Sequence, residues 1–362
     1  MSTLRTLSIV TILFLSACAT PQTSINKVDS VAAEIEAKKQ RELVVQDWVE
    51  AEQRLFRIGY PILVKGIPFC EKTSFQTGMI VWSATGLKKE WEEAFRSVYG
   101  LSDILEVNYI APDAAATEGG LKIGDVLITV NDWSVPVGEK AKKKFDKKLK
   151  DLLKNDAPIE FKVRRGENDL TLTINPEKAC DYQIVLDPAN DLNAFADGKT
   201  ITFHKGLMDF FRTDQEVALV FSHELAHNTM EHVEAKTQNA VIAGAGGFIV
   251  DLLGALAGIN TQGQFTDMAM RAGGGAFSVA FEAEADYVGL YIMASVELEI
   301  EKSSHFWRRM SLKNAQGISM ATSHPANADR FVGIENTIKE IKAKIAAGEP
   351  LEPEMKKTKK VQ

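Results

Sequence analysis

Two histidines, His223 and His227, are separated by three residues, the first of which is Glu224. Residues four apart lie on one face of an α-helix, so both imidazoles can reach a single metal ion. A glutamate next to the first histidine is placed to take a proton from a zinc-bound water. The chain has only six histidines, so this pattern is hard to obtain by accident. It predicts two zinc ligands and a general base, with two hydrogen-bonded histidines on a core helix as the alternative.

The residues after His227 exclude one class of zinc peptidase. Metzincins continue the motif with a glycine and a third histidine, whereas this chain has Met230 and Val233 at those positions. His232 comes five residues after His227, which rotates it off the ligand face of a continuous helix. We therefore expect His232 on the surface and the third ligand elsewhere in the chain.

An acidic run containing Glu282, Glu284 and Asp286 offers that ligand. Spacing alone does not choose between the two glutamates. Together with the histidine pair, the run resembles the gluzincin peptidases that include HtpX, BepA and the CAAX prenyl endopeptidases (peptidase family M, number forty-eight). These combine the HExxH helix with a later Glu-x-x-Ala-Asp motif. The resemblance implies one Zn²⁺ per chain, Glu282 as the third ligand, Asp286 as the partner of a ligand histidine, and Glu284 in solvent.

The segment before the zinc helix also resembles the family. Residues Asn193, Ala194 and Phe195 precede a predicted strand at 200–203 and are similar to an edge strand that lines the cleft. The resemblance implies that this strand can pair with the substrate backbone, and a plain structural strand is the alternative. We expect His204, which follows, to be exposed.

A later element, His324 followed by proline and then by Arg330, resembles the family's His-Pro…Arg segment. The resemblance implies a regulatory or transition-state role for His324 and Arg330, because in BepA-like members the matching histidine can reach the zinc. A histidine that only caps a helix is the alternative for His324.

The elements that position these residues are partly visible in the sequence. Thr213 and Glu216 have capping-box spacing, and the apolar run 217–221 suits a buried helix over 217–232. Residues 241–259 are long and apolar enough to cross a membrane. A single crossing would place the zinc ligands on opposite sides, so we predict a buried or membrane-apposed helical hairpin there.

Residues 103–176 have the order of a small β-rich module. A strand at 104–110, a helix at 139–153 and a hairpin at 159–163 and 170–174 surround the run from Gly120 to Asp132. This order and run resemble a PDZ domain, which implies that an extended peptide can add as a strand beside the helix. The loop 99–102 matches the carboxylate-binding loop of such domains only weakly.

The N-terminus is typical of a targeting segment. An apolar run at 7–15 leads to Leu-Ser-Ala before Cys18, which resembles a bacterial lipoprotein signal and implies lipidation of Cys18 and sorting to the outer membrane. The alternative is an ordinary cleaved signal peptide or a short anchor. The compartment is then oxidising, so Cys70 and Cys180 can form a disulfide, with two buried free thiols as the alternative.

Composition sets the outer limits. The chain has 362 residues, is 45% hydrophobic and carries a net charge of −7, which argues against nucleic-acid binding. We predict an α+β protein: a mainly helical gluzincin metallopeptidase domain with a small sheet, plus a PDZ-like domain. The expected parts are a signal peptide (1–17), a tether (18–27), a helix packed on the peptidase (28–66, helical to 58), the PDZ-like domain with flanks (67–180), the peptidase (181–345) and a disordered charged tail (346–362).

The predicted function is a zinc metalloendopeptidase of the bacterial envelope, lipid-anchored to the outer membrane and facing the periplasm. Its substrates would be extended or misfolded polypeptides, and the outer-membrane assembly machinery is a candidate partner. Another class of function is a chaperone-like factor that holds clients in the PDZ groove with little proteolysis. A structural zinc site is less compatible with the motif, because such sites usually have four protein ligands.

Overall fold

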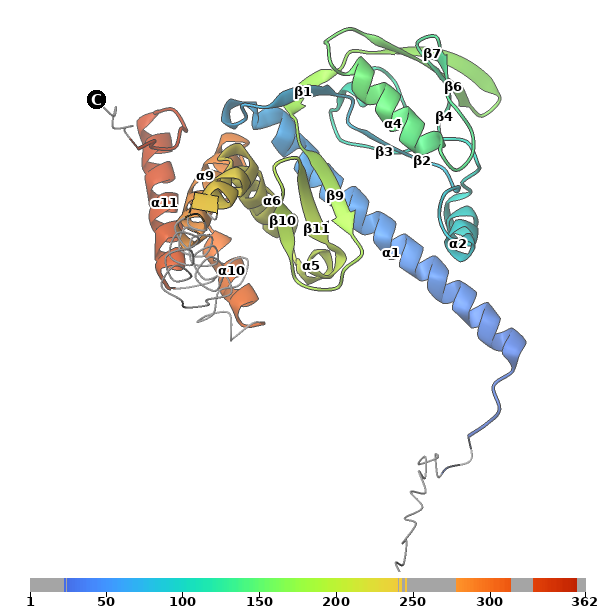
Figure 1. The fold of residues 1–362 in the computed structure, drawn as a ribbon, viewed down its shortest axis with the longest axis horizontal. Helices are drawn as coiled ribbons and strands as arrows, with labels where there is room; N and C mark the ends of the chain where they lie inside the picture. The colour runs from blue at the N-terminus through green and yellow to red at the C-terminus, as the bar shows by residue number, and fades with distance from the viewer. Residues whose placement is uncertain are drawn as a thin grey trace, which may run out of the picture. The chain divides into compact units, whose positions relative to one another are not determined.

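The computed structural model describes residues 23, 25–239, 241–242, 245, 278–313 and 328–356 (Figure 1). The signal peptide, Cys18, most of the apolar segment 241–259 and His324 lie outside this part of the chain. The chain divides into two compact units, Met1–Gln40 and Arg41–Gln362. Among the helices that are described, none has the length and apolar character needed to cross a membrane.

Helix α1 (Ser30–Lys65) is longer than the sequence predicts. The expected end of the helix at residue 58 is wrong, because the helix continues through Gly59 and Pro61 to Lys65. A proline removes one helical hydrogen bond, but Ile62 and Leu63 after it are buried, and this burial outweighs the local penalty. Gly59 lies so close to helix α6 (Asp214–Thr229) that a Cβ atom would come within 2.4 Å of the Phe221 ring.

A six-stranded antiparallel sheet forms the β-rich module, and its order confirms the strands and hairpin read from the sequence. The strands run in the order β2-β3-β4-β6-β7, with β5 paired to β4. Helix α4 (Ala141–Leu152) packs on this sheet through Phe145, which shares a core with Leu127 and Phe161. The strand bounds are β2 Met79–Trp82, β3 Glu106–Ile110, β4 Val126–Val130, β5 Trp133–Ser134, β6 Ile159–Arg165 and β7 Asn168–Ile174. Two further helices are α2 Lys89–Tyr99 and α3 Ala115–Glu118.

The two ends of this module are joined to each other. After the short helix η1 (Ile67–Phe69), strand β1 (Thr73–Gln76) pairs antiparallel with β8 (Glu177–Cys180). The structure also contains the expected disulfide between Cys70 and Cys180, whose Cα atoms are 5.6 Å apart. The chain thus enters and leaves the module at one covalently closed point.

The remainder combines a small sheet with helices, so the fold as a whole is α+β. The sheet order is β10-β11-β9, where β9 (Gln183–Asp187) is parallel and β10 (Ala194–Ala196) antiparallel to β11 (Thr200–His204). The helices are α5 Lys205–Phe210, α6, α9 Ser278–Ser295, α10 Ser303–Ser311 and α11 Ala328–Ala347. The tail is ordered further than predicted: the Glu354 backbone N–H donates to the Tyr287 hydroxyl at 2.9 Å.

Helix α6 is the buried centre of this part. The Thr213 hydroxyl accepts from the Glu216 backbone N–H at its start, which confirms the predicted cap. Every residue from Val217 to Asn228 is buried, so the helix is covered on all sides. Helix α9 approaches it closely at Gly289, where a Cβ atom would lie 3.1 Å from the His223 backbone.

Candidate metal centre

Helices α6 and α9 bring His223, His227 and Glu282 together. The two Nε2 atoms are 3.2 Å apart. Glu282 Oε2 lies 3.3 Å from His223 Nε2, and Glu282 Oε1 lies 3.3 Å from His227 Nε2. The three ligand atoms lie within 4.8 Å of one another, and all three residues are buried. The three residues expected to bind the metal, including Glu282 rather than Glu284, thus lie together in the structure.

These distances suit a zinc ion. Nitrogen and oxygen ligands at about 2.0–2.1 Å from a tetrahedral zinc are separated from each other by roughly 3.3 Å. Two imidazoles and a carboxylate are also among the ligands that zinc prefers. Three protein ligands leave one tetrahedral position for another group, which is the arrangement of a catalytic rather than a structural site.

His223 is held from behind by a buried ion pair. Its Nδ1 lies 3.0 Å from Asp286 Oδ1, and Arg330 donates to both oxygens of Asp286, from Nε at 2.5 Å and Nη2 at 2.8 Å. Burial raises the pKa of Asp286, but the charge of Arg330 and the hydrogen bond with His223 outweigh it and lower that pKa. Arg330 therefore contacts the partner of a metal-site histidine.

The same carboxylates control the charge of His223. Burial by itself lowers the pKa of His223, but hydrogen bonds with Asp286 and Glu282 outweigh burial and raise the pKa to about 9. Trp307 covers this group, with its ring 4.0 Å from the Arg330 guanidinium carbon and 5.3 Å from the His223 ring. The aromatic side chain of Trp307 thus shields the ion pair from solvent.

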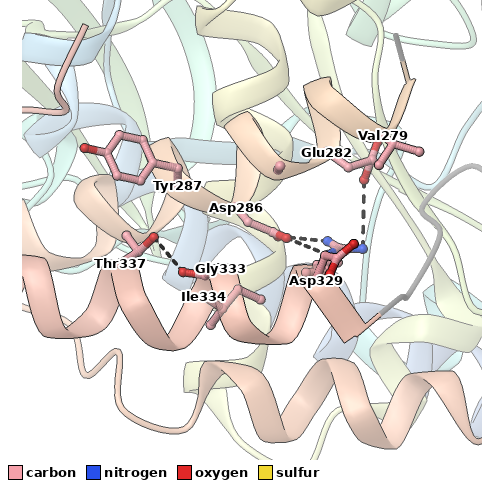
Figure 2. Close-up of a pocket in the computed structure, with 10 residues that line it drawn as sticks. Val279, Glu282, Asp286, Tyr287, Asp329, Gly333, Ile334 and Thr337 are labelled. Atoms are coloured by element: carbon pink, nitrogen blue, oxygen red, sulfur yellow. Dashed lines mark hydrogen bonds and ion pairs between the residues drawn. The ribbon is translucent and has the colours of Figure 1, made fainter. Parts of the chain in front are cut away.

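A cavity of about 260 Å³ lies beside the carboxylates of the site, between α9 and α11. Glu282 and Asp286 project into it from α9, whereas Asp329 and Ile334 come from α11 (Figure 2). Glu224 follows His223 on α6 and is 1% exposed. Burial lowers the pKa of Arg330, but the carboxylates of Asp286, Glu282 and, with the smallest contribution, Glu224 outweigh burial and raise that pKa. The candidate base therefore lies in the same buried charged group as the ligands.

The expectation that His232 lies on the surface is wrong, since the residue is 1% exposed. Helix α6 ends at Thr229, and Glu231 adopts φ +53° before a second helical stretch begins. This left-handed residue turns the chain, so the angle of a continuous helix does not apply. His232 Nδ1 lies 2.8 Å from His227 Nδ1, and its Nε2 lies 3.1 Å from Glu284 Oε2. The Glu284 side chain is half-exposed but is not simply solvated.

The predicted substrate strand is an edge strand next to α6. Ala194 is buried and Phe195 is 40% exposed, and β10 pairs on one side with β11. Asn228, which the sequence does not single out, ties this sheet to α6: its Nδ2 donates to Thr200 O and its Oδ1 accepts from Gly198 N. His204 is half-buried rather than exposed, and its Nδ1 lies 2.6 Å from Asp191 Oδ1.

Comparisons with known proteins agree with this geometry. Residues 168–338 match the model of peptidase family M48. The mitochondrial metalloendopeptidase OMA1 of Schizosaccharomyces pombe is 26% identical over 45% of this chain and 48% of its own length. The OMA1 of Saccharomyces cerevisiae is 28% identical over 44% of this chain and 46% of its own length. The chain thus spans about half the length of the curated relatives it matches.

Among solved structures, the crystal structure of the HtrA3 PDZ domain bound to a phage-derived ligand is similar to this chain. It is 22% identical with a TM-score of 0.23, and the match covers 30% of this chain and 89% of that chain. An HtrA-type protease with a decapeptide is 20% identical with a TM-score of 0.22, over 29% of each chain. The segment that matches the family model contains the histidine pair, Glu224, Glu282 and Asp286.

Proposed function

We propose that this chain is a zinc-dependent endopeptidase that holds one Zn²⁺ with His223, His227 and Glu282. The observation that carries the proposal is the set of three ligand atoms at the mutual distances of a tetrahedral zinc site. Zinc, when bound, supplies Lewis-acid chemistry that polarises a scissile carbonyl and acidifies water. The match to peptidase family M48 over residues 168–338 supports the same activity.

The chain's own residues would perform the remaining steps. Glu224 would accept the proton of the attacking water and later deliver it to the leaving amine. Asp286 Oδ1 lies 3.0 Å from His223 Nδ1, where it would accept the ring proton and keep the other ring nitrogen directed at the ligand cluster. Trp307 and the buried faces of α6 and α9 exclude bulk water, which strengthens these interactions.

The substrates would be extended polypeptides. Strand β10 pairs with β11 on one edge, and its proximity to α6 supports the addition of a substrate strand through Asn193, Ala194 and Phe195. Phe195 exposes a large apolar side chain at this edge, which would favour an apolar side chain in the substrate. Unfolded or misfolded chains can readily supply such a strand.

The PDZ-like module would provide a second peptide site. Strand β2 pairs only with β3 among the described strands. A cavity of about 300 Å³ lies between its residues, Phe145 and Leu149 of α4, and Leu55 of α1. A peptide added at this edge would therefore contact α1 as well as the module, which links the long helix to substrate capture.

The location would be the periplasmic face of a bacterial outer membrane, with the chain anchored by lipid at Cys18. The residues that motivate this are the apolar run 7–15 and Leu-Ser-Ala before Cys18. Quality control of envelope proteins, with the outer-membrane assembly machinery as a candidate partner, is the role that follows from an endopeptidase in that place.

The test of the activity compares purified wild-type protein with Glu224→Gln on an unfolded substrate protein, with zinc content measured in parallel. Cleavage by the wild type alone, at equal zinc content, is the expected result. If the two proteins bind the substrate equally and neither cleaves it, a chaperone-like function replaces the endopeptidase.

A further inference from the structure

Both histidines of the candidate metal centre have a partner at the nitrogen that points away from the ligand cluster. For His223 the partner is Asp286, at 3.0 Å from Nδ1. For His227 it is His232, whose Nδ1 lies 2.8 Å from His227 Nδ1. Behind His232 stands Glu284, with Oε2 3.1 Å from the second ring nitrogen. Each metal-site histidine is therefore held by a second residue at Nδ1 and by a third, charged residue behind that one, but the residue types differ.

The order of donors and acceptors follows from the chemistry of imidazole. A neutral histidine that presents Nε2 to a metal carries its proton on Nδ1, which then needs an acceptor. His227 therefore donates from Nδ1 to Nδ1 of His232. The proton of His232 must then lie on Nε2, where it is donated to the Glu284 carboxylate. A single arrangement of protons satisfies all three residues, and the carboxylate fixes its direction.

We propose that His232 and Glu284 are positioning residues for the metal centre, and that they hold His227 in the tautomer and orientation needed to bind zinc. The proposal rests on the zinc site described above. It assigns to these two residues the task that Asp286 and Arg330 perform for His223.

The surroundings of His232 support this role. The ring is buried and stacks on Phe281, with centroids 4.6 Å apart and planes at 25°, so it cannot rotate freely. The chain reaches this place through Glu231 in the left-handed region, at φ +53°, a conformation that is unfavourable for a non-glycine residue. An unfavourable backbone conformation that puts a histidine against a metal-site histidine is consistent with a functional contact.

His232 and Glu284 differ in exposure, and this difference predicts which substitution weakens zinc binding more. The His232 side chain is 1% exposed, whereas that of Glu284 is 42% exposed. Water can replace an exposed carboxylate as an acceptor, but it cannot reach His227 without disturbing the core. Loss of the outer residue should therefore weaken zinc binding less than loss of the inner one.

The experiment measures zinc affinity of the purified full chain by competition with a chelator. His232→Ala should lower the affinity by about 10–100-fold, the usual effect of removing such a partner, and Glu284→Ala by a smaller factor, up to about 10-fold. The double variant should bind zinc as His232→Ala does, because Glu284 acts only through His232. His232→Asn, whose Oδ1 can accept from His227, should recover part of the loss.

The control for Glu284→Ala is Glu301→Ala. Glu301 is also a half-exposed carboxylate with one basic partner, Lys342 at 2.8 Å, and its loss should leave zinc affinity unchanged. Unfolding of the metal-free proteins is measured alongside, so that a structural defect is separated from weaker binding. If His232→Ala does not fold, Glu284→Ala decides, since its side chain is not part of the core.

The outcomes distinguish failure of this proposal from failure of the proposed zinc-dependent activity. Wild-type protein that binds no zinc would overturn the proposed activity and this inference together. Wild-type affinity in folded His232→Ala or, where that variant does not fold, in Glu284→Ala would overturn the positioning role and leave the zinc site intact. If the losses of zinc affinity in the two single variants add up in the double variant, the two residues act independently. That result would also reject the proposed chain of hydrogen bonds from His227 through His232 to Glu284.

Discussion

Arg330 and Asp286 form a two-pronged ion pair in which Nε and Nη2 donate to separate carboxylate oxygens at 2.5 and 2.8 Å. Both side chains are almost completely buried. Residue 330 lies on α11 and residue 286 on α9, so the pair joins the C-terminal helix to the helix that carries Glu282. Arg330 of the His-Pro…Arg segment thus joins two helices and also contacts the residue that holds His223.

Arg330→Ala should destabilise the protein by about 3–5 kcal/mol, because it leaves a charged Asp286 buried without the guanidinium that neutralises it. Arg330→Lys keeps the charge but cannot form both hydrogen bonds, so it should recover only part of the loss. Denaturant unfolding of the metal-free protein measures both variants. Arg308→Ala removes an exposed pair with Glu335 and serves as the control, with an expected change of about 0–1 kcal/mol. Equal stability of Arg330→Ala and wild type would contradict the role of the pair.

Glu224→Gln should keep its zinc and fold while peptidase activity falls by about 10²–10⁴-fold, since only the proton acceptor is removed. Glu282→Ala should instead lose zinc, because it deletes one of three ligands. Metal content by mass spectrometry and cleavage of an unfolded substrate, measured on the same samples, distinguish the two effects. Full zinc occupancy in Glu282→Ala would show that the ligand set is wrong.

Glu52, which lies outside the metal centre, should make the stability of the protein depend on pH. Its Oε2 is buried without a hydrogen-bond partner in the described structure, and burial raises its pKa to about 7, against a smaller opposing effect of Lys142. The folded state therefore binds this proton more tightly than the unfolded state, and stability falls as pH rises from about 4.5 to 7.

Glu52→Gln should remove this dependence and stabilise the protein by about 1–3 kcal/mol above pH 7. Thermal unfolding at pH 5 and pH 8 measures the difference between the two proteins. Glu50→Gln, an exposed carboxylate on the same helix, should leave the pH dependence unchanged. A Glu52→Gln protein that follows the wild-type pH curve would show that Glu52 does not titrate in this range.

Cys70 and Cys180 should be oxidised in protein isolated from an oxidising compartment. The disulfide closes a loop with a sequence separation of 110 residues, for which the chain-entropy model gives about 4–5 kcal/mol of stabilisation. Cys70→Ser combined with Cys180→Ser should therefore lower the free energy of unfolding by several kcal/mol. Peptide mapping without reductant tests the bond itself, and recovery of both peptides as free thiols would reject it.

Cys18→Ser should prevent lipidation and release the protein from membranes, because the hydroxyl cannot form the thioether that attaches the lipid. Membrane fractionation and intact-mass measurement of the mature protein provide the test. The predicted signal fails if wild type and variant fractionate alike and neither carries the mass of a lipid.

Local patterns in the sequence were sufficient for much of the site. The spacing of His223 and His227 determines a shared helix face, because every α-helix has the same periodicity. The cap at Thr213 and the hairpin of β6 and β7 were also predictable, since each depends on neighbouring residues. The choice of Glu282 over Glu284 came from the resemblance to a family, and the structure puts Glu282 in the cluster.

Tertiary structure decided what depends on contacts between distant segments. Helix α1 continues through Pro61 because Ile62 and Leu63 are buried against the core, a gain that local propensity does not include. His232 contacts His227 because the chain turns at Glu231 rather than continuing as a helix. Periodicity describes residues within one regular element, so it fails where an element ends, and only the folded chain shows which side chains meet there.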